Sequence, residues 1–297
     1  MALNRRDVLP MIRRALAEDR ARHDVTSLGI IPASQRIQAR IIAKSPGIAA
    51  GINVAMLTFA ALDPSIRCRR HVHSGAKLRR GTVILTVEGR ARSIFAAERT
   101  ALNFLMHLSG IATLTHAYVQ RVRGTRAKIF DTRKTLPGLR ALEKYAVHAG
   151  GGHNHRSDLA AAILIKTNHL RALGQGAGAG GRGKALEQLQ CSIVRARQMK
   201  PRSFVEVEVT NLQEFRAALS AKPHAILLDN WTLSEIQKAV RLMKPTPHAP
   251  RPTPLLEVSG GVTLANVRVI AKTGVDRISI GRLTHSAPAL DVALRVI

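Results

Sequence analysis

Six short apolar runs in the second half of the chain each end in a cluster of polar or glycine residues. Helix-like stretches follow most of these runs, and strands that alternate with helices pair in parallel. A chain of this length can close such strands into a barrel, and barrel enzymes work at the carboxyl ends of their strands. We therefore expect the polar clusters to form one ring around one site. The runs cover residues 129–130, 163–165, 205–208, 226–228, 257–258 and 278–280.

The first third of the chain has a different texture. Residues 7–19 have the apolar spacing of an amphipathic helix, and residues 37–89 alternate short strands with turns and a helix near 54–62. Residues 95–121 predict a long helix that is interrupted at Ser109 and Gly110 and connects two domains. With 297 residues and 45% hydrophobic residues, the chain is long enough for a small α/β domain beside the barrel.

The net charge of +27 raises the question of nucleic-acid binding, because clustered Lys and Arg neutralise phosphates. Aromatic residues make up only 3% of the chain, so platforms for base stacking are scarce. The sequence shows no signature of a helix-turn-helix, a zinc finger or an RNA-binding sheet. We therefore do not expect nucleic acid to be the main ligand. A basic surface that steers anionic substrates or contacts a polyanionic neighbour is the preferred interpretation.

The cysteine content and hydropathy favour a cytoplasmic protein. Cys68 and Cys191 lie far apart and without zinc-site spacing, so neither a disulfide framework nor a structural metal site is indicated. The chain has no apolar run of about 18 residues, and its start lacks the apolar core of a signal peptide. We expect no membrane-spanning segment.

A glycine-rich segment formally matches a dinucleotide-binding pattern through Gly176, Gly178 and Gly181. The preceding predicted strand ends about ten residues earlier and does not run into the turn, as that fingerprint requires. A flexible basic loop over residues 171–186 is the preferred interpretation.

Two polar clusters of the ring suit an anionic ligand. Arg133 can grip a carboxylate or phosphate with two parallel hydrogen bonds, and Lys134 adds a compact charge, although a solvated pair on a loop is the alternative. Three glycines precede His153, His155 and Arg156, so the backbone can approach a ligand closely. The two histidines could also suggest a metal, but we find no third ligand and prefer anion binding.

Alternation in the third run places Glu206 and Glu208 on one face, toward the interior of a barrel. Buried carboxylates need cationic partners, and Lys166 at the end of a neighbouring strand can be one. Together with Asp229 at the end of the next strand, these residues fit a network of alternating charge that could bind Mg²⁺ or sugar hydroxyls. The alternative is a purely structural ion network.

Two glycine turns late in the sequence suit phosphate binding. Ser259, Gly260 and Gly261 are expected to open a helix, and Gly281 ends the last strand. Backbone amides at such turns bind phosphate, and the late loops of barrels commonly hold one.

With these residues in place, the chain resembles the quinolinate phosphoribosyltransferases. Near the start, Glu18 and Asp19 also match the family. The motifs occur in the family's order over almost the whole length: residues 97–104, 131–135, 151–156, 205–208, 227–230, 259–261 and 283–286.

The resemblance implies an N-terminal open α/β sandwich, residues 1–110 joined by 284–297, and an incomplete α/β barrel over 111–283. It implies that quinolinate and 5-phosphoribosyl 1-diphosphate, with Mg²⁺, give nicotinate mononucleotide, pyrophosphate and CO₂ in NAD biosynthesis. It also implies a homodimer or a hexamer of dimers, in which Arg99 reaches the partner's site.

The same resemblance assigns roles to the ring. Lys134, Lys166, Glu208 and Asp229 would be catalytic, and Glu208 and Asp229 would hold ribose hydroxyls or Mg²⁺. The substrate-binding set would be Arg99, Thr132, Arg133, Lys134, His155, Arg156, Lys166, Glu208, Asp229, Ser259, Gly260, Gly261 and Gly281.

Three features depart from the family pattern. Thr167 stands where Asp is usual, Arg282 stands where a small residue is usual, and the glycine-rich segment after Leu170 is longer than usual. Two other functions stay open. One is a related phosphoribosyltransferase for another aromatic acid, and the other is a non-catalytic paralogue that binds polyanions.

Overall fold

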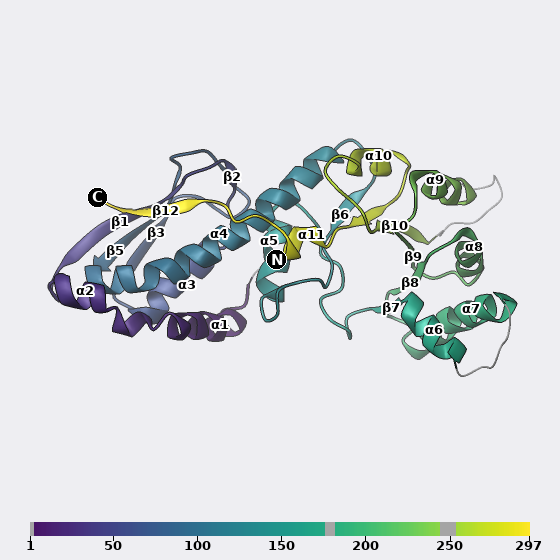
Figure 1. The fold of residues 1–297 in the computed structure, drawn as a ribbon, viewed down its shortest axis with the longest axis horizontal. Coiled ribbons are helices and arrows are strands. Elements are labelled where there is room, and N and C mark those ends of the chain that lie inside the picture. The colour runs from purple at the N-terminus through teal and green to yellow at the C-terminus, as the bar shows by residue number, and fades with distance from the viewer. Residues whose placement is uncertain (1–2, 176–181, 244–253) are drawn as a thin grey trace. The chain divides into compact units, whose positions relative to one another are not determined.

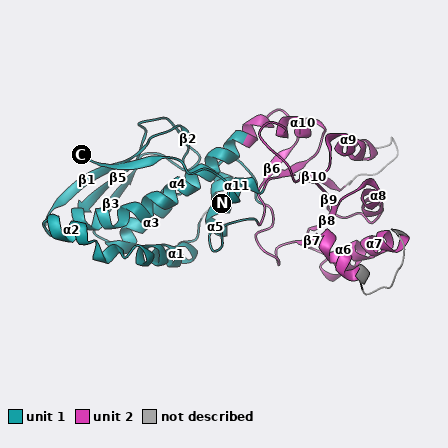
Figure 2. Cartoon of the chain, in the orientation of Figure 1, with its two compact units in different colours: residues 1–117, 134–154, 281–297 teal, residues 118–133, 155–280 magenta. Residues whose placement is uncertain are grey.

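The structure is a computed structural model that describes residues 3–175, 182–243 and 254–297. The chain divides into two compact units, the first formed by residues 1–117, 134–154 and 281–297 and the second by residues 118–133 and 155–280 (Figure 2). The limits of these units differ from the domain boundaries expected from the sequence, and those boundaries remain a prediction. No helix in the described ranges is both long and apolar enough to cross a membrane.

The first unit is built on a four-stranded antiparallel sheet with the order β12-β1-β5-β3. Along β1, Ala39 and Ile41 are fully buried while their neighbours Gln38 and Arg40 are exposed, so one face of the sheet packs and the other meets solvent. The strands are β1 (Arg36–Ala43), β3 (Arg67–Arg70), β5 (Val83–Arg90) and β12 (Val292–Val296), beside the short pair β2 (Gly47–Ile48) and β4 (Lys77–Leu78).

Helices pack against the buried face of this sheet (Figure 1). Helix α1 (Arg5–Glu18) begins at Asn4, whose side chain accepts a hydrogen bond from the Arg6 N–H, and it buries Val8, Ile12 and Leu16 at helical spacing. The other helical segments of this unit are η1 (Ala21–His23), α2 (Val25–Ile30), α3 (Ile52–Leu62), α4 (Ala91–Arg121, whose last turn enters the second unit), α5 (Arg140–Ala149) and α11 (Arg282–His285).

The expected interruption of the long helix at Ser109 and Gly110 is wrong, because α4 is continuous. The Ser109 hydroxyl accepts from the Ala50 N–H and donates to the Ala50 carbonyl, each at 3.0 Å. A side chain at Gly110 would collide with the backbone of Pro288. Both residues therefore serve close packing on the helix surface and do not end the helix.

The second unit contains a six-stranded parallel sheet with the order β6-β11-β10-β9-β8-β7, and helices α6 to α10 lie along it (Figure 1). All six predicted apolar runs lie in strands of this sheet. In the described residues, β6 and β7 are the edge strands and do not pair with each other, in agreement with an incomplete barrel. The strands are β6 (Lys128–Phe130), β7 (Ile163–Ile165), β8 (Val205–Val209), β9 (Ala225–Asp229), β10 (Leu255–Ser259) and β11 (Arg277–Ser279).

The helices of the second unit connect these strands. They are α6 (Thr167–Gln175), α7 (Arg182–Met199), α8 (Leu212–Ser220), α9 (Leu233–Leu242) and α10 (Val267–Lys272). The predicted basic loop over residues 171–186 is therefore helical at both ends. Its three pattern glycines, at positions 176, 178 and 181, lie outside the described residues.

Candidate active site

Strand β8 directs its two glutamates away from the helices, as its alternation predicted. Val205, Val207 and Val209 are fully buried. Glu208 is half-buried, and its Oε2 lies 3.3 Å from the Nζ of Lys166 at the end of β7. This ion pair confirms the predicted contact between Lys166 and a glutamate of β8. Its Oε1 accepts from the Thr167 N–H at 3.2 Å and from the Thr167 hydroxyl at 2.9 Å. Thr167 therefore orients this carboxylate.

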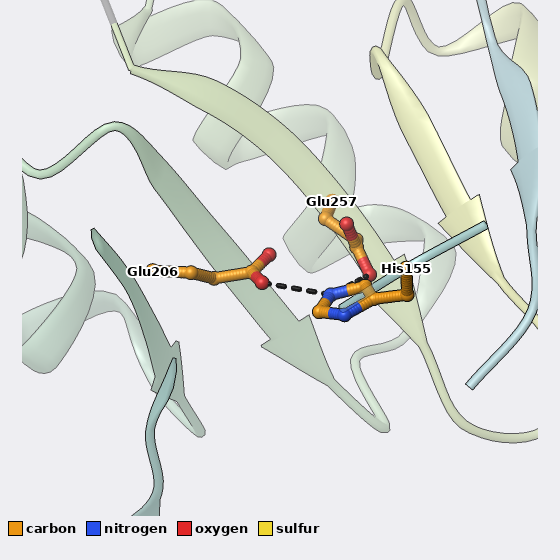
Figure 3. A group of neighbouring side chains, drawn as sticks. All are labelled: His155, Glu206 and Glu257. Atoms are coloured by element: carbon orange, nitrogen blue, oxygen red, sulfur yellow. Dashed lines mark hydrogen bonds and ion pairs between the residues drawn. The ribbon is translucent and has the colours of Figure 1, made fainter. Parts of the chain in front are cut away.

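Glu206 has a different partner from Glu208. Glu206 lies two residues deeper along β8, about 6.6 Å for a parallel strand, and its Oε2 is 2.8 Å from the His155 Nε2. Glu257 approaches the same ring nitrogen, with its Oε1 at 3.5 Å (Figure 3). Both glutamates are almost completely buried. The three side chains converge from three different segments of the chain.

Glu257 and Arg277 were missed at the level of sequence. They are cross-strand partners on β10 and β11, and the Arg277 Nε lies 2.8 Å from the Glu257 Oε2. The guanidinium also stacks over the Phe130 ring, 4.1 Å from its centroid. Alternation would have found them, because Glu257 precedes Ser259 by two residues and Arg277 precedes Ser279 by two.

The two buried glutamates favour their protonated forms. Burial, followed by the charge of Glu206, raises the pKa of Glu257 to about 7, against the attraction of Arg277. Burial also raises the pKa of Glu206, against the attraction of Arg277. Two close carboxylates in a dry site cannot both ionise freely, because the charge of one disfavours the charge of the other.

The hydrogen bonds of His155 define its protonation. The Arg156 backbone N–H donates to the His155 Nδ1 at 2.8 Å. A backbone N–H only donates, so Nδ1 holds a lone pair and the ring proton sits on Nε2, which donates to Glu206. The ligand atoms of His155, Glu206 and Glu257 lie within 4.8 Å of one another, close enough for a metal. They do not fit one, because Nε2 is protonated and Arg277 already supplies the positive charge.

The loop that carries Arg156 is anchored to buried groups. The His155 N–H donates to the Oδ1 of the buried Asp131 at 2.8 Å, and the Arg156 Nη1 donates to the Ala162 carbonyl at 3.1 Å. Burial lowers the pKa of Arg156, and the nearby charge of Arg133 lowers it further. The two guanidinium groups thus repel one another across a partly buried space. An anion with two charges would relieve that repulsion.

The other predicted residues of the second unit lie at strand ends. Thr132 follows β6, and Asp229 ends β9 in register with Ser259 on β10; all three are half-buried. Gly260 and Gly261 have φ of +86° and +61°, and a side chain at Gly260 would collide with that of Asn230. Helix α10 begins only at Val267. The expectation that these glycines open a helix is therefore wrong, and their amides belong to a turn.

Three predicted residues belong to the first unit. Arg99 is exposed on α4 and lines a hollow of about 360 Å³ with Glu18, Asp19 and Asn103. Lys134 is exposed, and its carbonyl accepts from the Thr284 hydroxyl at 2.7 Å. A Cβ at Gly281 would lie 3.0 Å from the Lys134 Cδ, so glycine leaves room for the lysine stem.

Comparisons with known proteins agree along the whole chain. The family models for the N-terminal and C-terminal domains of quinolinate phosphoribosyl transferase match residues 24–109 and 111–295. The chain is 43% identical to a nicotinate-nucleotide pyrophosphorylase [carboxylating] of Mycobacterium leprae, over 95% of each chain. The crystal structure of NadC from Streptococcus pyogenes superposes with a TM-score of 0.88 at 34% identity, covering 100% of this chain and 99% of that one. A nicotinate-nucleotide pyrophosphorylase from Francisella tularensis gives 0.85 at 36% identity, covering 100% and 98%.

Proposed function

The chain belongs to the quinolinate phosphoribosyl transferase family, and from this premise we infer that it transfers the phosphoribosyl group of 5-phosphoribosyl 1-diphosphate to quinolinate. The products are nicotinate mononucleotide, pyrophosphate and CO₂, in the de novo synthesis of NAD. The agreement of both family models over nearly the whole chain carries this conclusion. The ring of strand-end residues supplies the chemistry that the reaction needs.

Quinolinate carries two carboxylates, and the paired charges of Arg133 and Arg156 suit such a dianion. We assign His155 a positioning role, since both of its ring nitrogens bond within the protein and its backbone anchors the loop of Arg156. Glu206, with Glu257 and Arg277 behind it, holds the imidazole in one tautomer. Thr132 borders the same strand end.

The diphosphate co-substrate suits the remaining residues. The turn amides of Gly260 and Gly261, with Ser259 and Gly281, can accept the 5-phosphate. Lys134 and Lys166 would neutralise the diphosphate. Glu208 and Asp229 would bind the ribose hydroxyls.

Transfer breaks the bond between the anomeric carbon and the diphosphate and forms a bond from that carbon to the pyridine nitrogen. Positive charge develops on the ribose, so Glu208 and Asp229 stabilise the transition state while the lysines stabilise the leaving group. The resulting pyridinium accepts the electrons released with CO₂, and a proton takes the place of CO₂ on the ring carbon. The protein contributes mainly positioning and electrostatics.

The donor set fits Mg²⁺ as the cation that accompanies the diphosphate. Glu208 and Asp229 offer carboxylate oxygens on adjacent strands, and Mg²⁺ commonly binds through one or two carboxylates together with substrate phosphates. The ion would supply charge neutralisation to the diphosphate. Glu208 is already shared with Lys166, so Asp229 is the more available ligand.

The assembly and location are also proposals. We propose a homodimer, or a hexamer of dimers, in which Arg99 completes the partner's site from its exposed position on α4. We place the protein in the cytoplasm, where its two cysteines stay reduced.

The direct test incubates the purified chain with quinolinate, 5-phosphoribosyl 1-diphosphate and Mg²⁺ and follows nicotinate mononucleotide by chromatography. Turnover by the wild type and its loss in Arg133→Ala and Lys134→Ala would support the assignment. Folded wild-type protein without product would favour another aromatic acid as the acceptor.

A further inference from the structure

The outer face of the four-stranded sheet in the first unit is covered with arginine side chains. Along β1, every second residue points to this face. The strand registers place residues of β3, β5 and β12 on the same face. Its exposed arginines are Arg36, Arg40, Arg67, Arg69, Arg90 and Arg295.

The placement of these charges costs stability. Arg40 lies directly opposite Arg295, and Arg36 lies directly opposite Arg90. Like charges in such positions destabilise a sheet. Within the part of the chain that the structure describes, no hydrogen bond or ion pair engages any of the six guanidinium groups. Glu88, directly opposite Arg67, is the single acidic residue that the four strands place on this face. Asp63, outside the strands, interacts electrostatically with Arg90. Two carboxylates do not balance six guanidinium groups, so most of the charge is uncompensated.

The chemistry of the face indicates phosphate groups in a regular array. All six cations are arginines, whose planar fork binds phosphate with two parallel hydrogen bonds. Neighbouring strands are about 4.8 Å apart and alternate residues about 6.8 Å apart, so the cations form a grid. None of the four strands contains an aromatic residue, so the face has no platform for unpaired bases and suits backbone contacts.

We propose that this arginine face binds the sugar–phosphate backbone of double-stranded nucleic acid, without sequence preference, as an activity separate from phosphoribosyl transfer. Composition alone argued against nucleic acid as the main ligand. It could not reveal that six of the 34 arginines share one face of one sheet.

The test measures binding of a labelled DNA duplex of roughly 20 base pairs, two helical turns, between about 50 and 200 mM salt. The variant Arg40→Gln, Arg69→Gln, Arg295→Gln removes one row of the grid across three strands. Each lost phosphate contact lowers the salt slope of log K by about 1, so the triple variant should lose about 3 in slope and on the order of a hundredfold in affinity.

A matched control carries the same loss of charge in the second unit, through Arg195→Gln, Arg202→Gln and Arg241→Gln, all exposed. It should keep the wild-type slope, and both triple variants should keep transferase activity, which shows that they fold. Equal weakening in the two variants would overturn the proposal in favour of diffuse attraction. So would an absence of duplex binding, or preferential binding of heparin or anionic vesicles through the same row.

Discussion

Glu257 should make the free energy of unfolding fall as the pH rises. In the unfolded chain this carboxyl releases its proton near its ordinary pKa of 4.5, while in the folded protein it keeps the proton to about pH 7. Between these values the folded state binds more protons, so stability is lost as the pH rises. A difference of 7 − 4.5 = 2.5 pKa units corresponds to about 3 kcal/mol at about 1.4 kcal/mol per unit.

The substitution Glu257→Gln removes this titration while keeping the shape of the side chain. We expect the variant to gain about 3 kcal/mol relative to the wild type as the pH is raised from about 4.5 to about 8.5. Urea unfolding followed by the fluorescence of Trp231 measures this in the second unit. Trp231 is the single tryptophan of the sequence, is buried, and donates to the Val209 carbonyl at 3.0 Å.

The control is Glu187→Gln, an exposed glutamate on α7, which should leave the pH dependence as it is in the wild type. Parallel curves for Glu257→Gln and the wild type across this pH range would refute the reasoning, because they would mean that Glu257 is ionised throughout.

Three further changes test the site. Thr167→Val should lower kcat/KM for the diphosphate co-substrate by about tenfold, because it removes a hydrogen bond to a charged group that contributes about 1.4 kcal/mol. Thr167→Ser should retain the wild-type kcat/KM. Equal kinetics for the Val variant and the wild type would contradict the role of the hydroxyl. Glu206→Gln should raise KM for quinolinate more than it lowers kcat and should change the histidine ¹⁵N signals of the tautomer, and an unchanged tautomer would argue against positioning. Gly260→Ala should lower Tm more than Gly81→Ala. Both glycines have φ near +87°, but only at Gly260 would the added Cβ collide with a neighbour, the Asn230 side chain. Equal losses of Tm would show that backbone strain alone accounts for the effect.

The sequence alone identified the repeated strands and the family. The strands could be predicted because an apolar run that ends in polar residues is a local pattern, visible within one segment of the sequence. The positions of Lys166 and Glu208 at neighbouring strand ends followed from the same pattern, and their contact was confirmed. The continuous helix through Gly110 could not be predicted, because the reason for that glycine is a loop nearly 180 residues later in the chain.

Tertiary structure decided which charges meet. Glu206 and Glu208 look equivalent in the sequence, yet one is paired with a protonated ring nitrogen and the other with a lysine, because strand depth sets the available partners. The pKa of Glu257 depends on burial and on a second carboxylate about 50 residues away in the chain. The arginine face likewise depends on the register of four strands drawn from both ends of the chain. Periodicity determines which side of its own strand a residue faces, but only the packed fold determines what stands opposite.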